Sequence, residues 1–493
     1  MAFQVEVRSP IRLADFAEFA HLVAAVQGLQ TEAQPLLPKL ADRTIWMVNS
    51  TPTGGGVAEM LPTMVTLLRD LGLRVEWVVI DTEERGFFDV TKRIHNLLHG
   101  QGDPRLVPAD RELFESVNRQ NAAFLRARAR DGDVLIVHDP QPLPLAGMLQ
   151  EELDLTTIWR CHIGLDDETP ATRAAWEFLH PYARVYEHAV FSAPEYIPHY
   201  LSSHATIIYP AIDPLSFKNR ELGLHHTVGV LANSGLTVAP GPLVTPPYER
   251  LAERLGPDGR FHPANLTGDF GLLTRPIVTQ ISRWDGLKGF EPLLDAFARY
   301  KQRLLQGGWS DHPRHRIRQE IVRLVLAGPD PESIQDDPEG QGVLNALVER
   351  YRSLDPLIQE SIAIVTLPMQ SPEENAYMVN AMQRASSIVV QNSLREGFGL
   401  TIAEAMWKRV PILSNRQACG PRQQVRDGVD GRLIADPTSA RELADTLDAM
   451  LADEAGRQVW ARNAQRRVYN RFLVFAQLCE WLRLFAQLPR LAA

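Results

Sequence analysis

The order of apolar and polar positions predicts short buried strands separated by helices along most of the chain. The first complete unit runs from a strand at Thr44–Val48 to a second strand at Val75–Ile80. Between them apolar residues recur at helical spacing, and Gly72 stands where a helix would end. This helical face consists of Val57, Met60, Leu61, Met64, Val65, Leu68 and Leu71. The pattern predicts a strand–loop–helix–strand unit, and residues 1–40 before it read as helical.

Further short apolar runs form two series with helical segments between them. The first series is Val134–Val137, Thr157–Cys161, Ala189–Phe191 and Thr206–Tyr209. The second is Ile277–Ile281, Leu324–Ala327, Ile362–Thr366, Ile388–Gln391 and Pro411–Leu413. Strands that alternate with helices in this way are typical of a parallel sheet covered by helices on both faces. We therefore expect an α/β fold with two doubly wound domains.

The segment between the two series has a different character. Residues 222–274 are rich in proline and glycine, and their apolar periodicity is weak. We interpret this segment as a linker with a partly structured insertion. The expected division is a first domain, the linker, a second domain, and a C-terminal helix that crosses back to the first domain: residues 1–221, 222–274, 275–460 and 461–493.

Composition narrows the class of protein. Of 493 residues, 45% are hydrophobic and 23% are charged, and no run of apolar residues is long enough to span a membrane. The formal charge of −9 argues against nonspecific nucleic-acid binding. Three cysteines without metal-ligand spacing, and an N-terminus without a secretory pattern, indicate reduced thiols in a cytoplasm. We expect no membrane and no nucleic-acid partner, and a homodimer is conceivable.

A glycine loop is the first candidate for chemistry. Gly54, Gly55 and Gly56 lie between the first strand and the following helix. Exposed N–H groups at a helix N-terminus favour an anion, and glycines let a pyrophosphate approach the backbone closely. The alternative is a plain tight turn, because neither a dinucleotide-binding pattern nor a Walker lysine is present.

A second candidate is a pair of glutamates around a glycine turn. Glu396 and Glu404 enclose Gly397, Phe398, Gly399 and Leu400, just after a predicted strand. Carboxylates can accept paired hydrogen bonds from vicinal hydroxyls, so Glu396 could bind a sugar and Glu404 a ribose diol. The alternative is a capping box of Thr401 and Glu404, with Glu396 as a solvated loop charge.

Two cations follow the first strand of the second domain. Arg283 and Lys288 stand at the carboxyl end of that strand, where open α/β sheets bind ligands. They could neutralise a departing diphosphate. The alternative is a surface salt bridge with Asp285, which would contribute little.

Histidines end two strands of the first domain. His138 could contact a transferred sugar or an acceptor, and Arg160 and His162 end the next strand in the same way. The alternative is a structural role, which is the more frequent one for lone histidines of this kind. Asp131 and Asp133 match a minimal D-x-D metal motif, but they precede a buried strand, so a turn is favoured. No metal site is expected.

Several segments together resemble a known family. They are Asn49–Glu59, Phe88–Asn96, Val137–Pro142, Trp159–His162, Ile212–Ser216, Asp336–Gly340 and Arg395–Lys408. With Arg283 and Lys288, they are similar to the retaining GT-B glycosyltransferases of family four, and more narrowly to the trehalose glycosyltransferring synthases. The resemblance covers roughly residues 40–480, apart from residues 222–274. It implies two Rossmann-like domains that face a cleft.

The resemblance also implies a reaction and its residues. NDP-glucose and glucose would give α,α-trehalose and NDP, reversibly and with retention. Arg283 and Lys288 would hold the diphosphate, Glu396 the donor sugar and Glu404 the ribose. His138 would contact the donor hexose, the glycine loops would approach the donor, and Asn49, Arg160 and His162 would contact the acceptor. No tightly bound cofactor is implied, although Mg²⁺ could assist activity.

Alternatives remain at the level of sequence. The turn Asn415–Pro421 replaces a more usual glycine-rich turn, which leaves the donor base open. A different acceptor, such as a sugar phosphate, glycerate or glycan, would suit the same scaffold. A phosphorylase with a pyridoxal-phosphate lysine, or a catalytically silent nucleotide-sugar-binding relative, are the further possibilities. For the reaction itself we favour same-face displacement, with the leaving phosphate taking the acceptor proton.

Overall fold

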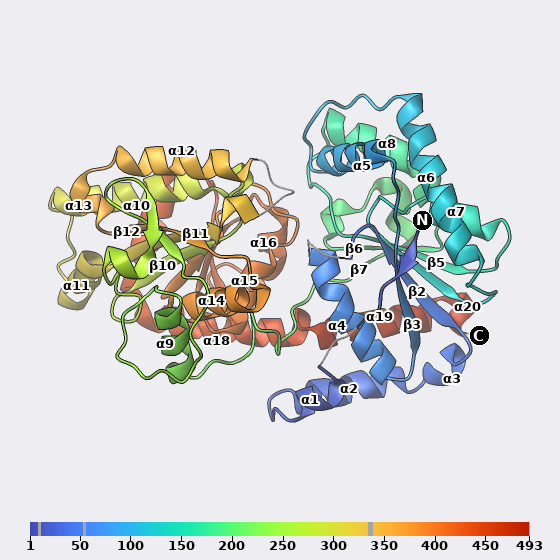
Figure 1. Cartoon of the computed structure of the whole chain (residues 1–493), viewed down its shortest axis with the longest axis horizontal. Helices are drawn as coiled ribbons and strands as arrows, with labels where there is room; N and C mark the ends of the chain where they lie inside the picture. Colours follow the sequence, from blue (N-terminus) through green and yellow to red (C-terminus); the bar gives the residue numbers. More distant parts are fainter. Residues whose placement is uncertain (8–10, 53–55, 334–338, 493) are drawn as a thin grey trace. The chain divides into compact units, whose positions relative to one another are not determined.

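The computed structural model describes residues 1–7, 11–52, 56–333 and 339–492. Over these residues the chain divides into two compact units (Figure 1). The first contains Met1–Asp213 together with Arg471–Ala493, and the second contains Pro214–Asn470. The first boundary thus falls eight residues earlier than the expected position at residue 221.

The first unit is built on a mainly parallel sheet. Its strand order is β1-β3-β2-β4-β5-β6-β7, and only the pairing of β1 with β3 is antiparallel among the described strands. The strands, in sheet order, are Phe3–Gln4, Arg74–Val79, Thr44–Asn49, Val134–His138, Thr156–Cys161, His188–Phe191 and Ala205–Ile207. β4 and β5 are buried along their whole length, which explains why their residues are apolar or β-branched apart from His138 and Arg160 near their carboxyl ends.

Helices cover this sheet, as the period of the apolar residues predicts. They are α4 (Gly56–Asp70), α5 (Arg85–Leu98), α6 (Pro108–Arg126), α7 (Leu145–Gln150) and α8 (Pro170–Ala183). The apolar face predicted for α4 is buried at Leu61, Met64, Val65 and Leu68. The short helices α1 (Leu13–Ala17), α2 (Val23–Ala33) and α3 (Leu37–Leu40) account for the helical character of the N-terminus.

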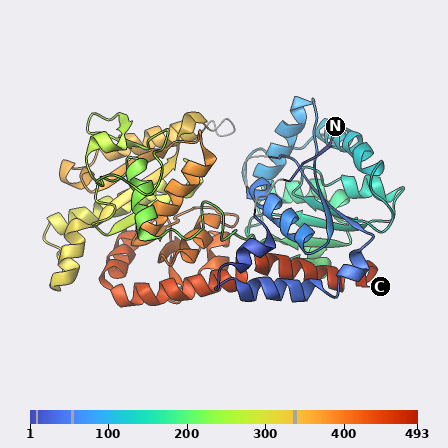
Figure 2. The same cartoon turned by 60° about the horizontal axis from the view of Figure 1, so that its bottom comes forward.

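The C-terminal segment packs within the first unit. Helix α19 (Val474–Gln487) lies against α2, with α20 (Pro489–Ala492) beside α3 (Figure 2). Phe16 and Phe475 meet edge to face, with their ring centroids 5.0 Å apart. Ile212 exchanges backbone hydrogen bonds with the start of α19, donating to Phe472 O and accepting from Val474 N. The two chain segments at the boundary of the unit are therefore joined to each other.

The second unit contains another mixed sheet. Its order is β15-β14-β13-β10-β11-β12-β8-β9, and the strands are Gly431–Ile434, Ile412–Asn415, Ile388–Val390, Ile277–Ile281, Arg323–Pro329, Ile362–Leu367, Glu253–Leu255 and Phe261–Pro263. The neighbours from β15 to β12 are parallel, whereas β8 runs antiparallel to β12 and to β9.

Residues 222–274 belong to this unit, which differs from the expected linker. They supply β8 and the edge strand β9, and also α9 (Leu224–Asn233), which packs on α14 (Pro372–Ala385). Buried residues of the segment, including Val230, Leu231 and Ala252, join the apolar cluster on that face of the sheet. Strands of three residues among prolines and glycines have too little periodicity to be recognised in a sequence.

Helices cover the two faces of the second sheet. The remaining helices of the unit are α10 (Phe290–Leu305), α11 (Pro313–Ile321), α12 (Gly340–Arg352), α13 (Pro356–Gln359), α15 (Leu400–Trp407), α16 (Cys419–Gln424), α17 (Ala440–Ala452) and α18 (Glu454–Arg471). Two buried apolar clusters result, one that includes α10 and α17 and one that includes α9 and α14. This is the doubly wound arrangement that the alternation of strands and helices predicts.

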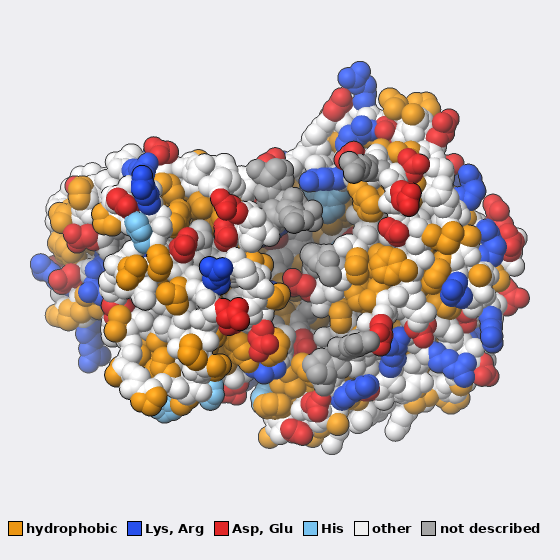
Figure 3. Space-filling model, in the orientation of Figure 1, with side chains coloured by type: hydrophobic (Ala, Val, Ile, Leu, Met, Phe, Trp, Pro, Cys, Tyr) orange, Lys and Arg blue, Asp and Glu red, His pale blue; other side chains and the backbone are white. Residues whose placement is uncertain are grey.

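The charge distribution on the surface and the apolar character of the helices can be compared with what nucleic-acid or membrane partners would require. Acidic and basic side chains intermingle on the face shown in Figure 3, rather than gathering into the single-sign stripe that a nucleic-acid backbone attracts. Within the described ranges, no helix combines the length and the apolar character needed to cross a bilayer.

Replacing Trp481 tests how much α19 contributes to the first unit. The Trp481 side chain is 1% exposed. Trp481→Ala should lower the free energy of unfolding by about 3–5 kcal/mol, because it removes a large buried side chain and leaves a cavity. Val459→Ala, at an exposed position of α18, should change it by less than about 0.5 kcal/mol. Urea unfolding measures both, and equal effects would show that α19 is not a core element.

Candidate functional site

The strand orders locate the ligand-binding edge of each unit. In the first unit β2 leads to β3 on one side, and the chain then returns to β4 on the other side of β2. In the second unit β10 leads to β11 and β12, and the chain returns to β13 on the other side of β10. Open α/β sheets bind ligands at the carboxyl ends of strands where the winding reverses in this way. The segments after β2 and β4, and after β10 and β13, are therefore the expected binding segments.

In the second unit these two segments meet in an ion pair. Lys288 follows β10 and Glu396 follows β13, and Lys288 Nζ lies 2.7 Å from Glu396 Oε2. Both side chains are largely but not fully buried, at 16% and 12% exposure. The structure thus brings together two side chains that are 108 positions apart and were predicted to serve one ligand.

Local turns hold Lys288 in place. The Asp285 carboxylate accepts a hydrogen bond from the Leu287 N–H and caps the short 3₁₀ turn η4 (Gly286–Lys288). Gln280, at 0% exposure on β10, donates to the carbonyl of Lys288. Gly289 follows at φ 66°, where a Cβ atom would lie 2.2 Å from the carbonyl oxygen of Asn392. Glycine is therefore required after the lysine, and Arg283 lies exposed at the start of this segment.

Two further side chains hold the Glu396 carboxylate. Ser393 Oγ donates to Glu396 Oε2 at 2.9 Å, and Gln391 Nε2 lies 3.3 Å from the same oxygen. Gln391 and Ser393 are themselves buried and hydrogen-bonded to each other at 2.8 Å. One carboxylate oxygen is thus fixed by an ammonium, a hydroxyl and an amide, which sets the orientation of the whole group. Sequence reasoning missed Ser393, because a serine in a loop carries no distinctive signal.

The glycine turn brings α15 and α16 close to Glu396. Gly399 has φ 81°, and a Cβ atom there would lie 2.9 Å from Glu396 Cγ. Gly420 of α16 lies against the backbone of Phe398, where a Cβ atom would approach within 2.4 Å, and its N–H donates to the carbonyl of Glu396. Helix α15 begins at Leu400 with Gly399 as its N-cap, which excludes the capping box of Thr401 and Glu404.

Glu404 occupies a separate, more buried position on α15. The residue is 6% exposed, and its Oε1 lies 3.9 Å from Lys218 Nζ. Its carbonyl accepts from Lys408 Nζ, which also donates to Gln383 at 2.7 Å and to Asn219 at 3.2 Å. Burial lowers the pKa of Lys408 to about 7, and the nearby Glu404 opposes that shift. The two glutamates share no hydrogen-bonding partner among the described contacts.

Lys218 and Lys408 were not singled out from the sequence. A signal existed, because only six of the 51 basic residues are lysines. Three of those six, Lys218, Lys288 and Lys408, lie beside the two glutamates. At these positions an arginine-rich chain carries the compact ammonium group of lysine and not the planar guanidinium group of arginine.

In the first unit the candidate residues form a buried cluster at the ends of β4 and β5. His138 pairs with Arg160 in the parallel register, and His162 is two positions further along, on the same side of the strand. His138 Nδ1 lies 3.1 Å from His162 Nε2, and the two rings stack with 13° between their planes. The Arg160 side chain is 1% exposed and donates to Ser192 Oγ at 3.4 Å.

Burial sets the charge states of this cluster. It lowers the pKa of His138 to about 3 and that of His162 well below its usual value, and the Arg160 guanidinium adds to both shifts. Burial also raises the pKa of the Asp139 carboxylate to about 6, against the hydrogen bond from His162 N–H and the charge of Arg160. Asp139 has φ 63°, a left-handed conformation that aspartate tolerates better than most residues.

The other residues predicted for the first unit lie in different structural settings. Asn49 is 3% exposed, and its amide accepts from Trp77 Nε1 and donates to the carbonyl of Thr51. Gly54 and Gly55 lie outside the described residues, and Gly56 begins α4. The Asp133 carboxylate accepts from Trp46 Nε1 and from two backbone N–H groups, so it stabilises a turn, as favoured over a metal motif.

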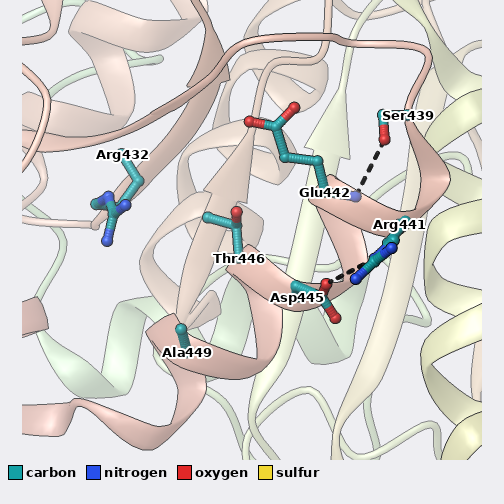
Figure 4. Close-up of a pocket in the computed structure, with 7 residues that line it drawn as sticks. All are labelled: Arg432, Ser439, Arg441, Glu442, Asp445, Thr446 and Ala449. Carbon is teal, nitrogen blue, oxygen red and sulfur yellow. Dashed lines mark hydrogen bonds and ion pairs between the residues drawn. The ribbon is translucent and has the colours of Figure 1, made fainter.

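A surface pocket in the second unit is a competing location. It is lined by residues of β15 and α17, namely Arg432, Ser439, Arg441, Glu442, Asp445, Thr446 and Ala449 (Figure 4). Ser439 accepts from the Glu442 N–H as a helix cap, and Arg441 pairs with Asp445 one turn further along. These contacts are those of an ordinary exposed helix face, and the pocket contains none of the candidate residues.

Comparisons with known proteins show the family of the chain. The family model "Trehalose synthase, N-terminal domain" matches residues 47–198, and "Glycosyl transferases group 1" matches residues 271–467. The trehalose synthase of Thermococcus litoralis is 31% identical over 478 residues, which are 96% of this chain and 96% of that protein. The trehalose synthase of Rubrobacter xylanophilus is 33% identical, over 93% of this chain and 94% of that protein.

The chain belongs to the trehalose synthase family. A trehalose phosphorylase of Pleurotus sajor-caju is also similar, at 25% identity over 92% of this chain but 59% of that protein. Among solved structures, an α,α-trehalose-phosphate synthase (UDP-forming) of Burkholderia vietnamiensis has a TM-score of 0.63 at 18% identity, over 90% of this chain and 98% of that one. These findings confirm the GT-B fold and a glycosyltransferase whose activity is related to trehalose.

The buried histidines predict a specific pH dependence of stability. His138 is held neutral in the fold. Its contribution to the free energy of unfolding is therefore fully present above the unfolded pKa of about 6.5, and it is lost as the pH falls towards 3. Between about pH 7 and about pH 5 the native chain should lose about 2 kcal/mol more unfolding free energy than His138→Gln, which cannot charge. Urea unfolding at the two pH values measures this difference.

The control for this comparison is the exposed histidine His225. His225→Gln should follow the native chain, because a hydrated side chain gains or loses little on folding. If the native chain and His138→Gln lose the same free energy, His138 is not held neutral by the fold.

Proposed function

We propose that the protein transfers a glucosyl group from an NDP-glucose to glucose and makes α,α-trehalose, reversibly and with retention of configuration. The ion pair of Lys288 and Glu396 at the switch point of the second sheet carries this proposal. In this pair the ammonium group could bind a diphosphate, and the oriented carboxylate could accept hydrogen bonds from sugar hydroxyls. Membership in a family of trehalose synthases supports the choice of product.

The donor would bind at the second unit. Arg283 and Lys288 would hold the diphosphate, Glu396 would accept hydrogen bonds from the hexose hydroxyls, and Glu404 would bind the ribose. The loop Gly397–Leu400 would contribute backbone N–H groups. Glu404 is the most buried of these groups, and access to it would depend on movement of Lys218, the side chain 3.9 Å from its carboxylate.

The first unit would supply contacts to the sugars. His138 would contact the donor hexose, and Asn49, Arg160 and His162 would form the acceptor side. The glycine loop of residues 54–56 would approach the donor. No metal or cofactor enters these steps, and Mg²⁺ would act only through the diphosphate.

The chemistry that this arrangement suits is same-face displacement. The oriented Glu396 carboxylate is engaged by Lys288, Ser393 and Gln391, which makes it a poor nucleophile. The leaving phosphate would take the proton of the acceptor hydroxyl. Lys288 and Arg283 would stabilise the charge that develops on that phosphate, which is the largest electrostatic demand of the step.

The product decides between this proposal and its alternatives. The protein should convert UDP-, ADP- or GDP-glucose and glucose into trehalose, identified by chromatography and by NMR of the two α-anomeric positions. A product formed only with glucose 6-phosphate would indicate a trehalose-phosphate synthase, and release of glucose 1-phosphate from trehalose and phosphate would indicate a phosphorylase. No turnover of any donor would indicate a silent relative.

Removing the cations should abolish most of the activity. Arg283→Ala and Lys288→Ala should each lower kcat by about 100-fold or more, because developing negative charge on the diphosphate loses its partner. Arg441→Ala is the matched control, since it removes an exposed cation from the pocket of Figure 4 and should leave kcat unchanged. Thermal unfolding checks that each variant folds. Activity that is lost in Arg441→Ala but kept in Lys288→Ala would move the site to that pocket.

Alanine variants of two glycines test whether the position of Glu396 matters for donor binding, apart from the backbone strain that both variants share. Gly399 and Gly428 have φ of 81° and 72°, but a Cβ atom at Gly428 would meet nothing within 4 Å. Both alanine variants should lose about 1–2 kcal/mol of stability. Only Gly399→Ala should also raise KM for the donor, because its Cβ displaces Glu396. An unchanged donor KM in Gly399→Ala would exclude Glu396 from donor binding.

A further inference from the structure

The cluster of His138, Arg160 and His162 contains an arrangement that the proposed reaction does not by itself require. The two imidazoles face each other through one nitrogen each, His138 Nδ1 and His162 Nε2, at 3.1 Å. On the far side of its ring, His138 Nε2 is buried without a protein partner among the described residues. The same is true of Nη1 of Arg160. Two polar atoms are thus left for something other than the protein.

Counting protons constrains what the histidine pair can present. If both rings are neutral, one of the two facing nitrogens carries a hydrogen and the other accepts it. The outer nitrogens then have opposite roles: when His138 Nδ1 donates, His138 Nε2 accepts and His162 Nδ1 donates, and the reverse tautomer exchanges these roles. If the pair gains a proton, both outer nitrogens become donors. The number of protons therefore decides what the pair offers to a ligand.

The surroundings of the pair favour the neutral form. Arg160 is adjacent on β5, in register with His138, and its guanidinium is as buried as the imidazole. The other titratable groups nearby are Asp139, which follows β4, and Cys161 of β5. Ser192, which follows β6, and Asn49, at the end of β2, do not titrate. Arg160 is thus the fixed positive charge of the cluster.

We propose that Arg160 is a positioning residue that acts together with burial to keep the His138–His162 pair neutral, so that one outer nitrogen is a donor and the other an acceptor towards substrate hydroxyls. A sugar hydroxyl both donates and accepts, so it can bind either nitrogen, whereas a pair that carries an extra proton has no acceptor left. The hydroxyl as ligand rests on the proposed glycosyl transfer, whereas the neutral pair itself does not. This role is additional to the acceptor contact proposed for Arg160, whose Nη1 atom has no protein partner among the described residues.

Two variants separate charge from shape. Arg160→Met keeps much of the length of the side chain and removes its charge, whereas Arg160→Lys keeps the charge. In Arg160→Met a cause of the lowered histidine pKa is gone, so the pair should take up a proton at higher pH. The midpoint of its titration should rise by about one pH unit or more, and Arg160→Lys should restore it.

NMR of the histidine-labelled full chain measures this directly. In the native protein at about pH 7, the ¹⁵N shifts of the pair should show one protonated and one bare outer nitrogen, and they should stay so down to about pH 5. His138→Gln and His162→Gln assign the signals. Two protonated outer nitrogens at pH 7 would overturn the proposal, and so would a titration that is the same in Arg160→Met and the native chain. If Arg160→Met does not fold, Arg160→Gln, which also removes the charge but keeps a donor for Ser192, takes its place in the same titration.

Kinetics distinguish this inference from the proposed function. If trehalose forms, the acid limb of kcat/KM for glucose should move to higher pH in Arg160→Met and return in Arg160→Lys. An acid limb that does not move would overturn the role of Arg160 while leaving the proposed function intact. If the NMR titration shifts as expected but no trehalose forms, the proposed function fails and the neutral pair stands.

Discussion

The contact between Lys288 and Glu396 is the interaction on which the site of the second unit depends. Each residue stands on its own segment after its own strand, and the ion pair joins the two segments. Removing either partner would leave the other charge largely buried without compensation, which costs more than the pair itself contributes. Three buried side chains fix the two residues. Gln280 donates a hydrogen bond to the carbonyl of Lys288, and Gln391 donates to Ser393, which in turn donates to the Glu396 carboxylate.

The two units use opposite electrostatic means to hold polar groups at a sheet edge. In the second unit an ammonium and a carboxylate form an ion pair at 2.7 Å. In the first unit the histidines near Arg160 are held neutral, because burial and a nearby positive charge both disfavour the imidazolium. A charged edge suits a diphosphate, and a neutral edge suits the uncharged hydroxyls of a sugar. This difference agrees with a division of labour between nucleotide and sugar.

The fold was predictable from the sequence to the extent that strands were long and apolar. Most parallel strands of both units were recognised, because runs of consecutive buried apolar residues leave a clear pattern. The short strands β1, β8 and β9 were missed, since two or three residues carry no period. The parallel edge strand β15 was also missed, because its four residues include a glycine and an arginine. Residues 222–274 were taken for a linker for the same reason, although their few apolar side chains are buried against the sheet.

The site residues divide along a similar line. The sequence by itself determined which residues follow the carboxyl ends of strands, because apolar runs end where loops begin, and so it identified Lys288, Glu396, His138 and His162. Only the tertiary structure decided their contacts: that Glu396 pairs with Lys288, that Glu404 lies apart beside Lys218 and Lys408, and that Arg160 is buried against two stacked imidazoles. Strand neighbours are set by the packing of the whole sheet. Spacing along the chain therefore cannot reveal which loops meet or which charges are removed from water.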